Sequence, residues 1–431
     1  MSQFVTRKTP GDTAWFTHDR FGMFIHWGLY AMPARHEWVK NQERIPEAKY
    51  EEYFKRFDPD LYDARQWAKT AKAAGMKYAV LTTKHHEGFC MFDTKYTDYS
   101  VMHTPAGRDL VREYVDAFRA EGLKIGFYYS LIDWHHPDFP IDMLHPRRDD
   151  ADAQAQSEGR DMTRYAQYMR DQVTELLTNY GKIDVLWFDF SYANRHGDDA
   201  RAWMRGKGKD DWEAAALIAT ARGLQPGIII DNRTEIEQDL WTPEQHQPHE
   251  WVRHPETGEL VVWEACQTFS GSWGYHRDEG TWKSPEMLIQ MLISTVALGG
   301  NLLMNVGPTA RGEFDPRAVK ALKVYADWMH GNARAIYGCT MSEFTPPPDA
   351  RYTQRGDRLY LHLYAWPFRD VTLPGLAGKV AYAQLLHDGS EICFTDKVEE
   401  QTDIHSEGDV VLWLPVIKPD VVVPVIEIFL K

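Results

Sequence analysis

The feature that most constrains the fold is a regular alternation of short apolar runs with amphipathic stretches between residues 21 and 337. Short apolar runs bounded by polar residues are typical of strands buried on both faces. The expected strands lie at 21–28, 76–81, 124–129, 185–190, 227–233, 260–264 and 301–306. Most of them are followed by a helical pattern, and strands alternating with helices predict a parallel sheet. Roughly seven or eight such units predict an α/β fold with a (β/α)8-like barrel, which we expect to span residues 1–338.

After Gly338 the pattern changes to short strands with little helical periodicity. The triplet Pro346–Pro348 marks a linker, and alternating apolar runs follow at 359–363, 410–414 and 421–429. Runs of this kind predict an antiparallel sheet structure. We therefore expect a small C-terminal antiparallel β-sandwich over residues 339–431. Its simpler interpretation is a packing partner of the barrel, rather than an independent sugar-binding module.

The composition limits the partners and the compartment. A formal charge of −15 would repel nucleic acid and anionic membranes, so neither is an expected partner. No apolar run is long enough to span a bilayer, and the first ten residues lack the apolar core of a signal peptide. The four cysteines lie far apart, without a Cys-x-x-Cys pair, which favours free thiols in a reducing compartment. We expect a cytoplasmic protein; a homo-oligomer is compatible with the sequence, which does not fix the oligomeric state.

Polar residues stand at the ends of the expected strands. Asp189 lies near the end of an apolar run, where an ionised carboxylate is costly unless it is paired or has a task. The C-terminal strand ends of a parallel barrel meet at one face, where active sites are built. The other residues at these ends are His26, His85, His86, Tyr129, Arg233 and Glu264. A single histidine in such a position is usually a hydrogen-bonded core residue. Together they predict a polar socket for several hydroxyl groups, with an apolar wall from Phe24, Trp38, Trp187 and Trp273.

Several segments carry recognisable motifs: Phe21–Gly28, Glu37-Trp38, Lys84–Phe89, Tyr128–Ser130, Trp187–Asp189, Trp263-Glu264 and Gly299–Pro308. Together they resemble the motifs of the α-L-fucosidase family, glycoside hydrolase family twenty-nine, and they run in family order from residue 14 to about residue 338. The resemblance implies a retaining exo-glycosidase that removes terminal α-L-fucose from a fucosylated oligosaccharide or glycoconjugate. It implies a catalytic barrel with a C-terminal sandwich, and neither a cofactor nor a metal.

The resemblance also implies roles for single residues. The Asp of the Trp-x-Asp motif is the family's nucleophile, which corresponds to Asp189. The residues implied to bind the sugar are His26, Glu37, Trp38, His85, His86, Tyr129, Trp187, Arg233 and Trp273. Of these, Trp187 and Trp273 match, with Phe24, the apolar pocket for the C5 methyl group. Many family members read Asn-Asp-Arg where this chain has Asp231-Asn232-Arg233, which weakens the assignment of the neighbours more than that of the arginine.

Two residues are candidates for the general acid/base. Glu244, in a Thr-Pro-Glu sequence, resembles the form found in many bacterial members. Glu264 follows Trp263 at the end of an expected strand, where it could instead pair with a histidine or arginine of the socket. We favour Glu244, because a loop can bring a carboxyl group to the side of the leaving group.

Two other readings use the same residues. His26, His85, His86 and Asp189 could ligate a divalent metal in a barrel hydrolase, but the chain lacks the His-x-His and His-Glu-x-x-His spacings of such sites. A catalytically inactive sugar-binding protein is the other alternative. The presence of Asp189 and of both candidate acids favours an enzyme.

Overall fold

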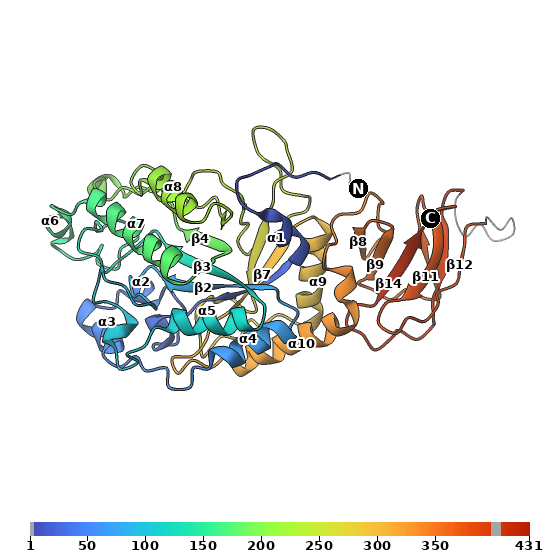
Figure 1. Cartoon of the computed structure of the whole chain (residues 1–431), viewed down its shortest axis with the longest axis horizontal. Helices are drawn as coiled ribbons and strands as arrows, with labels where there is room; N and C mark the ends of the chain where they lie inside the picture. Colours follow the sequence, from blue (N-terminus) through green and yellow to red (C-terminus); the bar gives the residue numbers. More distant parts are fainter. Residues whose placement is uncertain (1–3, 398–406) are drawn as a thin grey trace.

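The computed structural model describes residues 4–397 and 407–431, and its larger part is built around one parallel sheet (Figure 1). The strand order is β5-β4-β3-β2-β1-β7-β6, and every neighbouring pair is parallel. Nearly every residue of these strands is buried, so both faces of the sheet are covered. The strands are β1 (Phe21–Ile25), β2 (Tyr78–Lys84), β3 (Lys124–Ser130), β4 (Val185–Asp189), β5 (Ile229–Ile230), β6 (Glu264–Thr268) and β7 (Asn301–Val306).

Helices follow the strands and pack on the outer face of the curled sheet (Figure 1). Asp63, Asp109 and Ser284 cap three of them, because their side chains accept hydrogen bonds from backbone N–H groups of the first turn. The α-helices are α1 (Thr13–Asp19), α2 (Val39–Gln42), α3 (Glu47–Phe54), α4 (Ala64–Ala73), α5 (Leu110–Ala120), α6 (Ala153–Ser157), α7 (Met162–Asn179), α8 (Ala214–Leu224), α9 (Pro285–Ala297) and α10 (Pro316–Asn332). The 3-10 helices are η1 (Leu29–Ala31), η2 (Val101–His103), η3 (Asp199–Arg201) and η4 (Ala333–Ala335).

An irregular segment, residues 239–245, fills the place of an eighth strand between β5 and β6. Its Leu240 N–H donates to the Ile230 carbonyl at 3.2 Å, and its Trp241 N–H donates to the Val262 carbonyl at 3.0 Å. The segment therefore bonds to both edges of the seven-stranded sheet, although proline interrupts its pattern. The expected (β/α)8-like barrel is confirmed in this form.

Alternation along the strands decides which side chains enter the barrel. Tyr128 pairs with Trp187, and both belong to the apolar cluster inside the sheet. Their neighbours Tyr129 and Phe188 belong to the cluster between the sheet and the helices. Successive strand residues point to opposite faces, so Asp189, two positions after Trp187, points inward.

The C-terminal part consists of two antiparallel sheets that enclose their own apolar core (Figure 1). One has the order β11-β14-β9-β8 and the other β10-β13-β12. The expected β-sandwich is confirmed, whereas the boundary between residues 338 and 339 stays a prediction. The strands are β8 (Ala350–Arg355), β9 (Arg358–Leu363), β10 (Asp370–Leu373), β11 (Val380–Leu385), β12 (Phe394–Thr395), β13 (Val410–Trp413) and β14 (Val425–Leu430).

The sandwich packs against the end of α10, where the Trp328 indole N–H donates to the Val423 carbonyl at 3.0 Å. Among residues 4–397 and 407–431, no helix combines the length and the apolar character needed to cross a membrane.

Candidate active site

A cavity of about 70 Å³ lies at the C-terminal ends of the barrel strands. Its floor and walls come from β1, β3, β4 and β6, from the loops after β1, β2, β4, β5 and β6, and from the segment 239–245, so it lies where parallel barrels carry their chemistry. The lining residues are Phe24, His26, Glu37, Trp38, His85, His86, Tyr128, Trp187, Asp189, Phe190, Arg233, Glu244, Cys266 and Trp273.

One arginine holds two carboxylates in this cavity. The Arg233 Nη1 donates to Asp189 Oδ1 at 2.9 Å and to Glu244 Oε2 at 2.7 Å. The Arg233 Nε is fixed by Thr242 Oγ1 at 2.9 Å, and the guanidinium lies 4.5 Å from the centre of the Trp187 ring. Stacked and hydrogen-bonded in this way, the guanidinium fixes the distance between the two carboxylates.

The two carboxylates differ in their surroundings. Asp189 is 8% exposed, and its second oxygen, Oδ2, accepts a hydrogen bond from the Tyr128 hydroxyl at 2.7 Å. The Glu244 side chain is 45% exposed, on the open side of the cavity. Burial raises the pKa of Asp189 to about 6; the cation of Arg233 opposes this rise and the anion of Glu244 adds to it. Asp189 is therefore mostly ionised at neutral pH.

The orientation of His26 is set by Asn305 at the end of β7. Asn305 donates from Nδ2 to the Trp273 carbonyl at 2.6 Å, so its Oδ1 is left to accept from His26 Nδ1 at 2.6 Å. This arrangement places the proton of His26 on Nδ1 and leaves Nε2 as an acceptor. Burial lowers the pKa of His26 to about 3, so the ring is neutral and can accept a hydrogen bond from a hydroxyl group.

His85 and His86 are neutral for the same reason. Burial holds the pKa of both rings well below the ordinary value; proximity to another histidine adds to the effect at each ring, and the Lys84 cation adds to it at His86. Ser130 donates to the Ile132 carbonyl at 2.8 Å, so its oxygen accepts from His86 Nδ1 at 2.7 Å. The His86 Nε2, 3.9 Å from Asp189 Oδ2, is thereby left as an acceptor. The Nδ1 of His85 is buried and has no hydrogen-bond partner among the residues that the structure describes.

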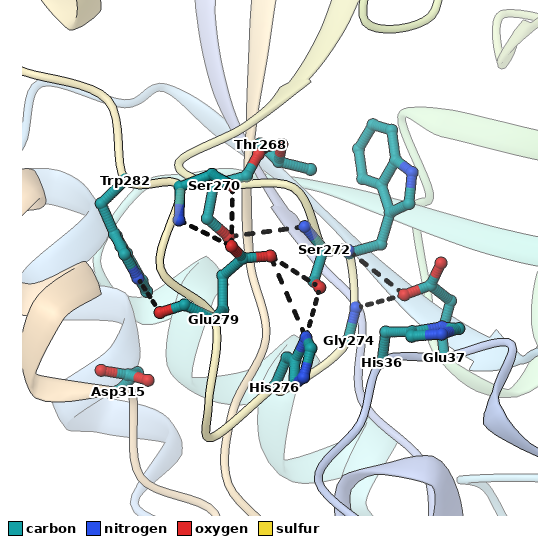
Figure 2. Close-up of polar contacts among 12 residues, drawn as sticks. His36, Glu37, Thr268, Ser270, Ser272, Gly274, His276, Glu279, Trp282 and Asp315 are labelled. Carbon is teal, nitrogen blue, oxygen red and sulfur yellow. Dashed lines mark hydrogen bonds and ion pairs between the residues drawn. The ribbon is translucent and has the colours of Figure 1, made fainter.

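Glu37 reaches the cavity from the loop after β1 and is held by the backbone of another loop. Its Oε2 accepts from the N–H groups of Trp273 at 3.2 Å and Gly274 at 2.8 Å (Figure 2). The Trp273 loop is itself fixed by Glu279, which accepts a hydrogen bond from Ser272 at 3.3 Å. Burial would raise the pKa of Glu279, but hydrogen bonds within the Trp273 loop outweigh it and lower the pKa to about 2, so the carboxylate remains an acceptor.

An apolar wall faces these polar groups. The Phe24 ring lies 5.2 Å from Trp187 and 5.9 Å from Trp273, measured between ring centres. Trp38 contacts His86 at 4.9 Å on the opposite side. A cavity with acceptors, one guanidinium and aromatic rings suits a single sugar ring that carries both hydroxyl groups and an apolar substituent.

Comparison with known proteins identifies the family. The profile of the family described as Alpha-L-fucosidase matches residues 4–334. The chain belongs to the α-L-fucosidase family. The "Plasma alpha-L-fucosidase" of Homo sapiens is 29% identical over 398 residues, which covers 82% of this chain and 76% of that protein. The rat enzyme of the same name is 30% identical over 387 residues, covering 82% of this chain and 78% of that protein.

Solved structures of α-L-fucosidases share the whole architecture. "Alpha-L-fucosidase isoenzyme 1" from Paenibacillus thiaminolyticus is 46% identical with a TM-score of 0.90, and the match covers 97% of this chain and 98% of that one. A GH29 α-L-fucosidase from Bacteroides thetaiotaomicron, described as a trapped covalent intermediate with 2-fluoro-fucosyl fluoride, is 27% identical with a TM-score of 0.82. That match covers 99% of this chain and 98% of the other.

Ten of the eleven residues expected in the site of this α-L-fucosidase family member line the cavity, and Tyr129 does not. Its hydroxyl donates to Gln172 Oε1 at 2.8 Å, between the sheet and α7. Tyr128 occupies the cavity instead. The strand alternation explains the error, because Tyr128 shares the inward face with Trp187 and Asp189, and this spacing in the sequence could have identified it.

Glu264 lies away from the cavity. It begins β6 rather than ending a strand, and it is fully buried beside Tyr78, whose hydroxyl donates to its carboxyl group. Burial raises the pKa of Glu264 to about 8, so it is protonated at neutral pH. It therefore sits at the N-terminal end of the barrel, and of the two acid/base candidates only Glu244 is next to Asp189.

Four further cavity or supporting residues were not expected from the sequence: Phe190, Cys266, Thr242 and Asn305. Asn305 lies in a recognised motif, but its partners come from segments distant in the sequence. Within the described part of the chain, no group of three His, Cys, Asp or Glu side chains is arranged to hold a metal ion.

Proposed function

We propose that this member of the family is a retaining, exo-acting α-L-fucosidase that works by double displacement through a glycosyl-Asp189 intermediate. The observation that carries the proposal is the shared contact of Asp189 and Glu244 with one nitrogen of Arg233. Asp189 Oδ1 and Glu244 Oε2 lie 2.9 and 2.7 Å from this nitrogen. The distance between these two oxygens therefore cannot exceed the sum of the two hydrogen-bond lengths. Carboxyl separations of about 5–5.5 Å are typical of retaining glycosidases, whereas inverting enzymes need about 6.5–9.5 Å.

In the first step an Asp189 oxygen attacks the anomeric carbon of fucose while the bond to the leaving oxygen breaks. Glu244 gives its proton to that oxygen, so the aglycone leaves as a neutral alcohol. In the second step Glu244 takes a proton from water, the water oxygen attacks the anomeric carbon, and Asp189 is released as a carboxylate. The exposure of the Glu244 side chain supports its role on the leaving-group side.

The cavity supports a single terminal 6-deoxy sugar as the group that is transferred. Neutral His26 and His86 offer Nε2 acceptors for sugar hydroxyl groups. Phe24, Trp187 and Trp273 offer an apolar surface to the C5 methyl group. A volume of about 70 Å³ favours one ring at a chain end over an internal residue of a polymer. The proposed substrate is a fucosylated oligosaccharide or glycoconjugate.

The proposal is tested with Asp189→Ala on an aryl α-L-fucoside. We expect loss of nearly all turnover, and partial rescue by azide, which would enter the space left by the carboxylate and give the product of inverted configuration. Wild-type turnover by Asp189→Ala would refute the proposed nucleophile.

We also propose that the protein works in a reducing, cytoplasmic compartment. Cys90, Cys266 and Cys339 are buried free thiols and Cys393 is an exposed one, which suits such a location. Detection of the protein outside the reducing compartment of its cell would contradict this part of the proposal.

A further inference from the structure

A second and much larger cavity adjoins the catalytic one. It has a volume of about 660 Å³ and shares Phe190 and Arg233 with the smaller cavity. Three loops build it: residues 190–195 after β4, residues 232–235 after β5, and residues 241–243, which immediately precede Glu244. We call this space the outer cleft. Because Glu244 stands where the two cavities meet, a leaving group protonated by Glu244 would lie in the outer cleft.

The outer cleft has aromatic walls. Trp241 is half-buried on one side, and Phe190 stands at the junction with the catalytic cavity. Phe190 has a φ of +81°, which is unfavourable for a residue with a side chain. Its ring lies 5.2 Å from Trp38 in the catalytic cavity and 5.8 Å from Tyr192 in the outer cleft. Strain of this kind next to Asp189 is typical of functional positions.

The outer cleft also has polar groups without partners. Within the described part of the chain, the side chains of Asn194, Arg195 and Asn232 make no hydrogen bond or ion pair with the protein, although all three residues line the cleft. Amide and guanidinium groups of this kind donate hydrogen bonds to hydroxyl and carbonyl oxygens. Glu235, another polar residue of the cleft, accepts from the Lys209 N–H at 3.0 Å through one carboxylate oxygen, Oε2.

The charges of the outer cleft balance. The cation of Arg195 is matched by the anion of Glu235, while the cation of Arg233 is already bound to Asp189 and Glu244. An acidic sugar or a sulfated group would meet no excess of positive charge. The walls instead combine an indole face with amide donors. A neutral pyranose can place its apolar face against the indole and its hydroxyl groups against the amides.

We propose that the outer cleft is a binding site for a neutral oligosaccharide leaving group of more than one sugar ring, with Trp241 as its stacking surface. The proposal rests on the proposed function of the catalytic cavity. A volume of about 660 Å³ falls within the roughly 300–1,000 Å³ usual for pockets that bury drug-sized ligands. The oligosaccharide to which the fucose is attached then mainly determines which substrates the enzyme accepts.

The test compares two kinds of substrate with the full-length protein. The value of kcat/KM is measured for an aryl α-L-fucoside and for a panel of neutral fucosyl trisaccharides of defined linkage. In Trp241→Ala we expect the ratio of the best trisaccharide to the aryl fucoside to fall about tenfold from the wild-type ratio, because one well-made contact is worth at least that much discrimination. The exposed side chain of Arg195 has no hydrogen-bond partner in the described part of the chain, and Arg195→Ala should lower the same ratio.

Trp366→Ala is the matched control, since Trp366 is another half-buried tryptophan but lies in the sandwich, where it bonds to the Pro415 carbonyl. It should leave the ratio unchanged. An unchanged ratio in both Trp241→Ala and Arg195→Ala would overturn the assignment of the outer cleft. Failure of the wild-type protein to hydrolyse any aryl fucoside would instead refute the proposed function, so the two failures are distinguishable.

Discussion

Tyr128→Phe removes one oxygen atom and with it the hydrogen bond of 2.7 Å to Asp189 Oδ2. A hydrogen bond to a charged group contributes about 1.5–3 kcal/mol, and about 1.4 kcal/mol corresponds to one pKa unit. Since this bond stabilises the carboxylate, its loss should raise the pKa of Asp189 from about 6 by about one unit. At pH 6 the ionised fraction would then fall from about one half to about one tenth, which lowers kcat/KM about fivefold through ionisation alone.

The assay is the pH dependence of kcat/KM on an aryl α-L-fucoside, which reports the ionisation of the free enzyme. The wild type should lose activity below an apparent pKa of about 6, because the nucleophile must be ionised. In Tyr128→Phe this acidic limb should move to higher pH by about one unit.

Tyr129→Phe is the matched control, as the adjacent tyrosine loses only its bond to Gln172 behind the sheet. Leaving the buried Gln172 oxygen unpaired costs about 1–3 kcal/mol of the free energy of unfolding, so the melting temperature should fall while the acidic limb stays in place. A shift of the limb in Tyr129→Phe, or no shift in Tyr128→Phe, would refute the reasoning.

Two further predictions concern the two candidate acids. Glu244→Ala should slow substrates with poor leaving groups far more than activated aryl fucosides, measured as kcat/KM across a leaving-group series; equal losses across the series would argue against a general acid. Glu264→Gln should keep its activity. Because the pKa of Glu264 in the folded protein, about 8, lies above its ordinary value of 4.5, the stability that this group contributes is present below pH 4.5 and is lost as the pH rises through 8. The melting temperature of Glu264→Gln relative to the wild type should therefore rise between these pH values, and a constant difference would contradict the buried, protonated acid.

The sequence was sufficient to predict the barrel and most of the residues that line its cavity. Strand periodicity located β4 and placed Asp189 at its C-terminal end, and the family motifs added the residues on the loops, such as Glu37 and Trp38. These predictions succeeded because buried strands and short motifs are encoded locally.

The misplacements have a common physical cause. Choosing Tyr129 over Tyr128 required the phase of the strand, which a run of consecutive apolar residues does not reveal. Placing Glu264 at the end of a strand required the start of β6, which hydrogen bonds to residues 239–245 and to β7 determine. The role of Asn305 depends on contacts with His26 and Trp273, which only the closed barrel brings together.

The central claim is that Asp189 forms the covalent bond to the sugar. The most direct measurement is to trap the enzyme with a 2-fluoro-fucosyl fluoride, digest it and locate the labelled residue by mass spectrometry. The account predicts one 2-fluoro-fucosyl group on the peptide that contains Asp189, with the anomeric fluoride released, and no label in Asp189→Ala. A label on Glu244 or on any other residue, or an inverted sugar product from the wild-type enzyme, would contradict it.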